Sequence, residues 1–189
     1  FGFMTDNLPA NAASIKNTLA RPQTIADPEP REAGRGIAGV QAQLWSETTR
    51  TDAGVDYQLF PRLIALAERG WHQPEWEPAY QPGASYSYDD SRIDKSAIDA
   101  DWNAFAGRMP VQLALLDKLG VAYRITPPGA KIVDGKLVAD TEYPEQVIEY
   151  RTVGGAWQAY SGPVAVDGAV EVRTRSADGQ RASRTVTVP

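Results

Sequence analysis

The sequence predicts an α/β part followed by an all-β part, namely the terminal part of a (β/α)8 TIM barrel and then a small β-sandwich. The spacing of apolar residues changes from a helical to a strand rhythm near residue 126. Before that point one alternating segment precedes two helical ones, which is the order of a β/α unit. After it, Asp-Gly pairs separate short β-branched runs, a strong hairpin signal. We therefore expect one domain over residues 1–125 and a second over residues 126–189.

The composition excludes several classes of function. Lys and Arg number 19 against 24 Asp and Glu, so the net charge is −5 and we expect neither a nucleic-acid nor a membrane partner. The absence of cysteine excludes disulfides, thiolate zinc sites and cysteine nucleophiles. No apolar run approaches the roughly 18 to 20 residues of a membrane span. Because the chain opens with Phe1 and lacks a signal-peptide pattern, we expect a processed chain or a piece of a longer one.

The first domain is expected to begin irregularly and then to form a strand and a helix. Residues 1–36 are rich in proline and glycine, with at most a short helix over residues 10–19. Residues 37–45 alternate with a period of two and predict a strand. A helix should follow with Asp52 as its cap, and Pro61 should kink it or begin a second segment.

A further long helix is expected after an aromatic loop over residues 72–93. Ser96 and Asp99 have the spacing of a capping box, Pro110 predicts a bend, and Gly120 should end the helix. The helical stripe consists of Ile98, Trp102, Phe105, Met109, Leu113 and Leu116. A short strand over residues 121–125 ends the first domain and leads into a stiff linker over residues 126–129.

The second domain is expected to be a compact β-sandwich with Trp157 as its core aromatic. Asp134, Asp167 and Asp178 each precede a glycine, which is typical of turns. The predicted strands cover residues 131–133, 136–139, 147–153, 157–160, 170–174 and 184–188.

The first domain is expected to be incomplete. A single parallel strand has no hydrogen-bonding neighbour at either edge, so it cannot form a sheet alone. The strand and its helices therefore have the pattern of the last β/α unit of a barrel, with the other strands upstream of Phe1.

Trp45 and Glu47 are the candidate binding residues. They lie at the carboxyl end of the predicted strand, which faces the active site in a β/α barrel. An indole covers the apolar face of a sugar ring, and a carboxylate accepts hydrogen bonds from its hydroxyls. A strand end followed by a helix-capping carboxylate would show the same local pattern.

The other candidates favour structural roles. His72 has neither an acidic partner at catalytic spacing nor a second histidine, so no triad or zinc site is expected. Asp89, Asp90 and Asp94 lack the spacing of a calcium loop and favour a solvated loop. Trp76, Tyr80, Tyr86 and Tyr88 could line a carbohydrate groove, although cover for the helices is the favoured role. No pair of carboxylates can be assigned as acid and base, so we expect no catalytic residue in this chain. Since no metal-binding or phosphate-binding spacing is present either, we expect no cofactor and no metal.

Several motifs together resemble the β-N-acetylhexosaminidases of glycoside hydrolase family 20. The block GVQAQLWSET at residues 39–48 is the most specific, and it is followed by FPR at residues 60–62 and AERGWH at residues 67–72. Residues 3–12 resemble the segment after the seventh barrel strand of bacterial chitobiases. Residues 120–130 resemble the entry to their C-terminal immunoglobulin-like domain. The resemblance therefore covers essentially the whole chain in the right order.

The resemblance implies a retaining hydrolase of terminal non-reducing N-acetylglucosamine, with chitobiose as a typical substrate. In this family the acetamido oxygen of the substrate attacks the anomeric carbon, a Glu protonates the leaving oxygen and an adjacent Asp orients the acetamide. These catalytic groups belong to barrel strands that this chain lacks. Trp45 and Glu47 match the eighth-strand Trp, which packs against the sugar, and the Glu, which binds its hydroxyls at positions four and six.

The expected partners are an N-acetylglucosamine-containing oligosaccharide and the N-terminal remainder of the barrel, either missing or present as a separate chain. Enzymes of this kind are commonly periplasmic or secreted. A noncatalytic carbohydrate-binding or interaction module, acting through the sandwich or the aromatic loop, is the alternative.

Overall fold

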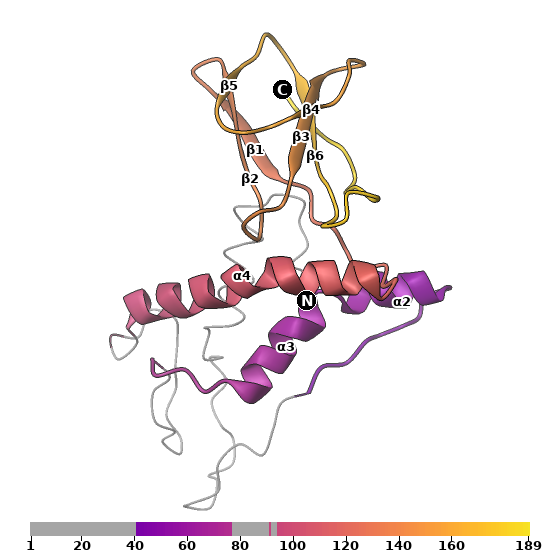
Figure 1. The fold of residues 1–189 in the computed structure, drawn as a ribbon, viewed down its shortest axis with the longest axis vertical. Coiled ribbons are helices and arrows are strands. Elements are labelled where there is room, and N and C mark those ends of the chain that lie inside the picture. Colours follow the sequence, from indigo (N-terminus) through magenta and orange to yellow (C-terminus); the bar gives the residue numbers. More distant parts are fainter. Residues whose placement is uncertain (1–40, 77–90, 92–93) are drawn as a thin grey trace, which may run out of the picture.

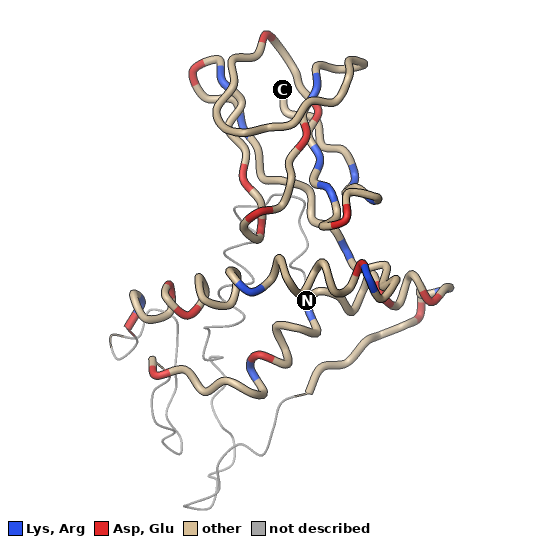
Figure 2. Tube along the Cα trace, viewed as in Figure 1, with Lys and Arg blue, Asp and Glu red and all other residues tan. Residues whose placement is uncertain are grey.

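Three helices lie on one side of a two-sheet β module in the computed structural model (Figure 1), which describes residues 41–76, 91 and 94–189. The predicted short helix over residues 10–19, the start of the predicted strand at residues 37–40 and most of the aromatic loop lie outside the described residues. None of the described helices is both long and apolar enough to cross a membrane. Acidic and basic residues are interspersed along the helices and the β module (Figure 2).

Helices α2 (Asp52–Leu59) and α3 (Arg62–Trp71) are separated at Pro61, which confirms that this proline begins a second segment. The cap of α2 is Thr51 and not Asp52, because the Thr51 hydroxyl accepts a hydrogen bond from the Gly54 amide at 3.1 Å. Asp52 instead places a negative charge in the first turn, where the helix dipole is favourable.

Helix α4 (Lys95–Lys118) carries the predicted apolar stripe. Its cap is Asp94 and not Ser96, since the Asp94 carboxylate accepts hydrogen bonds from the amides of Ser96 and Ala97 at 2.9 and 3.1 Å. The helix continues through Pro110 and ends before Gly120, which has a φ of 72°. All stripe residues except the half-buried Trp102 are buried, and Ala106 is buried with them.

Two predicted strands are not formed by the described residues. Residues 41–46 have no regular structure, and no strand pairs with them in the described part of the chain. Residues 121–125 are irregular because their amides bond elsewhere: Ala122 donates to Asp56 Oδ2 at 3.0 Å and Arg124 donates to the Phe60 carbonyl at 3.1 Å. The period of two at these residues therefore reflects packing against α2 and its end, and not a sheet.

The β module consists of two antiparallel sheets. One has the order β1-β2-β5 and the other the order β4-β3-β6-β7. Asp134 and Gly135, with φ of 50° and 71°, form the predicted turn between β1 and β2. The strands are β1 (Gly129–Val133), β2 (Lys136–Asp140), β3 (Ile148–Thr152), β4 (Gln158–Ala159), β5 (Val164–Ala165), β6 (Val170–Thr174) and β7 (Val186–Val188). The two-residue strand β5 was not predicted from the sequence.

The core between the sheets is aliphatic. Leu137 of β2 packs with Val170 and Val172 of β6, and all three are fully buried. Trp157 is not part of this core, contrary to our expectation. Its ring is half-buried and lies under the guanidinium groups of Arg151 and Arg173, at 4.4 and 4.0 Å from the ring centroid.

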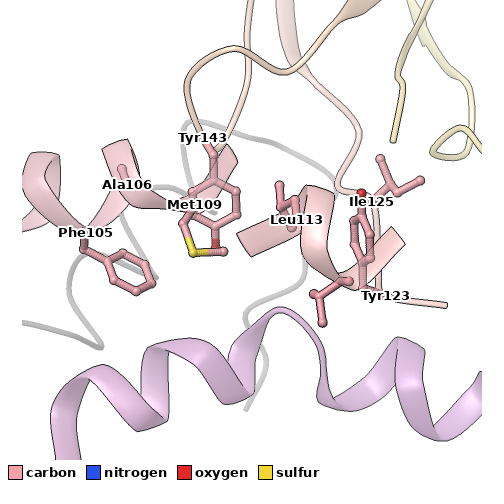
Figure 3. Close-up of a cluster of buried hydrophobic side chains, with 8 residues drawn as sticks. Phe105, Ala106, Met109, Leu113, Tyr123, Ile125 and Tyr143 are labelled. Carbon is pink, nitrogen blue, oxygen red and sulfur yellow. The ribbon is translucent and has the colours of Figure 1, made fainter. Parts of the chain in front are cut away.

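Tyr143 joins the β module to the helices. It lies in the loop between β2 and β3, yet it is buried in the cluster formed by the apolar side of α4 (Figure 3). Its ring centroid is 6.5 Å from that of Phe105 in an edge-on arrangement and 6.4 Å from that of Trp102. The helical core is therefore completed by a residue of the β module.

A buried carboxylate forms the polar part of the same junction. The Asp117 side chain is 3% exposed and accepts hydrogen bonds from Arg181 Nη2 at 2.8 Å, the Tyr123 hydroxyl at 3.0 Å and the Asp178 amide at 3.0 Å. Arg181 also donates to the Tyr123 carbonyl at 3.0 Å. Burial raises the pKa of Tyr123 to about 12, so this hydroxyl keeps its proton at neutral pH and remains a donor.

A second buried carboxylate, Glu142, precedes Tyr143. It forms hydrogen bonds with Thr126 and Tyr143 and lies near the positive charges of Arg124 and Arg62. Burial nevertheless raises its pKa above the ordinary value of 4.5, since desolvation of the carboxylate outweighs these favourable contacts.

We expect Arg181→Met to lower the free energy of unfolding by about 2 to 4 kcal/mol, because it leaves the Asp117 carboxylate buried without its cation. Arg108→Met is the matched control. Arg108 pairs with Glu68 at 2.5 Å but is 54% exposed, so its loss should cost at most about 1 kcal/mol. Urea unfolding of the two variants measures both values. Equal effects would contradict the role assigned to the buried carboxylate.

We expect Glu142→Gln to become progressively more stable than the wild type as the pH rises. A carboxyl whose pKa is raised in the folded state stabilises the fold below its unfolded pKa, and this contribution is lost as the pH rises through the folded pKa. The difference should begin near the unfolded pKa and grow by roughly 1.4 kcal/mol per pH unit until the pH passes the folded pKa. Urea unfolding between about pH 4 and pH 8 measures it, with Glu145→Gln on the exposed part of the same loop as control. A difference independent of pH would refute the raised pKa.

Candidate functional site

Trp45 and Glu47 lie in the segment that leads into α2. Residues 41–48 are exposed, and Trp45 is 70% exposed. The chain turns directly after Trp45, where the Thr49 amide donates to the Ser46 carbonyl at 3.0 Å. Glu47 lies within this turn and is also exposed. The structure therefore presents an open aromatic surface and a solvated carboxylate two residues apart.

This turn is held by α2. Gln58 Nε2 donates to Thr49 Oγ1 at 2.8 Å, across nine positions of the chain. The next residues cap the helix through Thr51. Glu47 does not cap α2, since Thr51 fills that position. The alternative interpretation of Glu47 as a capping carboxylate is therefore wrong.

An exposed indole and carboxylate in this arrangement suit a polyhydroxylated ligand. The indole offers an apolar face, and the carboxylate oxygens accept charge-assisted hydrogen bonds, each contributing roughly 1.5 to 3 kcal/mol. A metal ion has no comparable site here, because the described residues contain no group of three or more His, Asp or Glu side chains that could hold one.

The described grooves lie apart from Trp45 and Glu47. The larger has a volume of about 580 Å³ and lies between α2 and the loop before β7, with Tyr57, Gln58 and Arg181 in its wall. A smaller one of about 260 Å³ lies between α3 and α4 beside Trp71 and Arg108. Trp45 and Glu47 line neither groove.

His72 has an acidic partner that its position in the sequence did not predict. Its Nε2 lies 2.8 Å from Asp101 Oδ1, and Trp76 Nε1 donates to the other carboxylate oxygen at 3.1 Å. Asp101 is 29 residues away on α4, so spacing along the chain gave no signal of the pair. Trp76 is buried against Ile98. These contacts attach the end of α3 to α4, which agrees with the structural roles favoured for His72 and Trp76.

Asp94 is occupied as a helix cap. The hydroxyl of Ser96 and the amides of Ala97 and Ser96 donate to its carboxylate and lower its pKa. Asp89, Asp90, Tyr80, Tyr86 and Tyr88 lie outside the described residues. Nothing in the sequence indicated that Thr49 and Gln58 form a hydrogen bond, because neither residue belongs to a recognisable motif.

Two family comparisons match most of the chain. Residues 4–74 match the catalytic domain of glycosyl hydrolase family 20. Residues 112–185 match the chitobiase/beta-hexosaminidase C-terminal domain, and this match begins within α4.

Similar proteins agree with both matches. The N,N'-diacetylchitobiase of Vibrio harveyi is 36% identical over the whole chain, which covers 21% of that relative. The beta-hexosaminidase of Vibrio vulnificus is 35% identical over 85% of the chain and 20% of its own length. Beta-hexosaminidase B of Pseudoalteromonas piscicida is 44% identical over 56% of the chain and 14% of its own length. The chain thus spans about a fifth or less of these relatives. Residues 4–74 belong to a family 20 glycosyl hydrolase catalytic domain, and residues 112–185 belong to a chitobiase/beta-hexosaminidase C-terminal domain.

Proposed function

We propose that this chain is the C-terminal part of a β-N-acetylhexosaminidase that removes terminal non-reducing N-acetylglucosamine from β-linked glycosides such as chitobiose. The family matches and the names of the relatives support this activity. Catalysis is substrate-assisted in this proposal, so the acetamido oxygen attacks the anomeric carbon while a Glu outside this chain protonates the leaving oxygen. We also propose a periplasmic or secreted location, which is common among the enzymes that the sequence resembles.

Residues 1–125 form the closing part of a (β/α)8 barrel in this proposal, and residues 126–189 form an immunoglobulin-like sandwich. Residues 41–46, which precede α2, support the first assignment. They lack a neighbouring strand in the described part of the chain, and the remainder of a barrel would supply one. The two facing antiparallel sheets support the second.

Trp45 and Glu47 contribute one wall of the sugar pocket. The observation that carries this assignment is their joint exposure immediately before α2, within the segment that matches the catalytic domain. The indole packs on the sugar ring and its acetamide, and the Glu47 carboxylate accepts hydrogen bonds from the hydroxyls at positions four and six. The pair binds and orients the sugar, while bond cleavage depends on the rest of the barrel.

A noncatalytic carbohydrate-binding module is the second candidate, and the aromatic residues of the sandwich argue against it. The Trp157 ring lies under two guanidinium groups, and Tyr160 packs against the core while its hydroxyl accepts from the Ala139 amide at 2.9 Å. Neither ring presents an open platform for a sugar. Titration of residues 1–189 and of their Trp157→Leu variant with a chitooligosaccharide tests this candidate, and we expect the two to behave alike.

We expect Glu47→Gln to lower kcat/KM on a chromogenic N-acetylglucosaminide by about ten- to a thousandfold in the full-length protein that carries this sequence. The amide replaces one or two charge-assisted hydrogen bonds with weaker ones. Steady-state kinetics measures the effect. The melting temperature should stay the same, because Glu47 is exposed.

Glu75→Gln is the matched control, since Glu75 is also exposed and lies outside the proposed pocket. Residues 1–189 alone should show no turnover, since the acid and the acetamide-orienting group lie elsewhere in the proposed enzyme. Unchanged kinetics of Glu47→Gln would refute the site. Turnover by residues 1–189 alone would refute the proposal that the catalytic groups lie outside these residues.

A further inference from the structure

We propose that Gln58 is a positioning residue for the sugar pocket: through Thr49 it fixes the turn that carries Trp45 and Glu47. This inference rests on the proposed function, because it needs Trp45 and Glu47 to bind the sugar. Gln58 itself lies on α2 and acts through Thr49.

The contact lies where the exposed segment meets the fold. Residues 41–48 and Arg50 are exposed, whereas Thr49 is half-buried. The Thr49 amide closes the turn on Ser46, and its hydroxyl accepts the 2.8 Å hydrogen bond from Gln58 Nε2. Glu47 lies between the two ends of this turn. Fixing Thr49 therefore restrains both the carboxylate and the indole beside it.

The first turn of α2 supports Thr49 from a second side. A Cβ atom added to Gly54 would lie 3.5 Å from Thr49 Cγ2 and 3.2 Å from Thr51 Oγ1. The Thr49 methyl group therefore lies close to the space beside Gly54, where a larger residue would meet it. Gln58 lies one helical turn further along, and its side chain contacts the Thr49 hydroxyl.

Helix α2 is itself restrained, because hydrogen bonds attach it to the segment between α4 and the β module. Asp56 Oδ2 accepts from the Ala122 amide at 3.0 Å, and the Phe60 carbonyl accepts from the Arg124 amide at 3.1 Å. Both bonds join α2 and its end to the segment that runs into the β module. Gln58 thus connects an exposed binding turn to the buried junction of the molecule.

Loss of this hydrogen bond should weaken sugar binding more than the chemical step. A turn that must be ordered on binding lowers affinity, while a sugar that has bound still meets the same reacting groups. We expect Gln58→Met in the full-length protein to raise KM about three- to tenfold and to leave kcat within about twofold.

The test uses five variants besides Glu47→Gln. Thr49→Val removes the same hydrogen bond from the side of the turn, so the result does not depend on helix α2 tolerating the substitution. The double variant Thr49→Val with Gln58→Met measures whether the two residues act as one unit. Gln58→Glu should retain near wild-type KM, because the Thr49 hydroxyl can donate to its carboxylate. Gln158→Met, on an exposed residue of β4, is the matched control.

The inference is supported if each of Gln58→Met and Thr49→Val raises KM, the double variant raises it no further, and Gln58→Glu keeps it near the wild-type value. It is overturned, with the proposed function intact, if Glu47→Gln is impaired while Gln58→Met and Thr49→Val match the Gln158→Met control. Multiplying effects in the double variant would also overturn it. If Glu47→Gln has wild-type kinetics, the proposed function fails and this inference fails with it.

Discussion

The junction between the helices and the β module depends on one buried carboxylate. Asp117, in the last turn of α4, accepts donors from the following segment and from the loop before β7, so a single side chain brings three parts of the chain together. A buried anion is tolerated only when its hydrogen bonds are satisfied, and here they are satisfied only if the helices and the β module are both in place. The position of α2 follows from this arrangement, because Ala122, next to Tyr123, donates to Asp56. The turn with Trp45 and Glu47 is attached in its turn to α2, through the hydrogen bond between Gln58 and Thr49.

Elements with local signals could be predicted from the sequence. The break at Pro61, the stripe of α4 and the Asp-Gly turn at Asp134 each depend on residues within one element, and the structure confirms them. The cap positions were wrong by one or two residues because neighbouring hydroxyl and carboxylate groups competed for the same amides. The strand predicted over residues 121–125 is not formed, because alternation reflects which side chains are buried and not which groups bond to the backbone.

Contacts across the chain could not be predicted. Trp157 was expected in the core because it is the largest apolar side chain of its domain, yet two arginines on neighbouring strands cover its ring and allow it to remain at the surface. The pair of His72 with Asp101 and the contact of Gln58 with Thr49 join residues whose types are common and whose spacing carries no pattern. Trp45 and Glu47 were proposed from the end of a predicted strand, which residues 41–46 do not form, and from a specific block of the family, and their role stays a prediction.

Tyr143 shows that the β module cannot be replaced by that of a homologue independently of the helices. It belongs by sequence to the β module but lies in the packed interior beside α4 (Figure 3). A chimera joined at the linker over residues 126–129 would bring a foreign β2–β3 loop, and the cavity or overlap it created would lie in the interior beside α4. In a chimera of two homologues, α4 and the β2–β3 loop should therefore come from the same parent. The crossover point then lies before α4 and not in the linker.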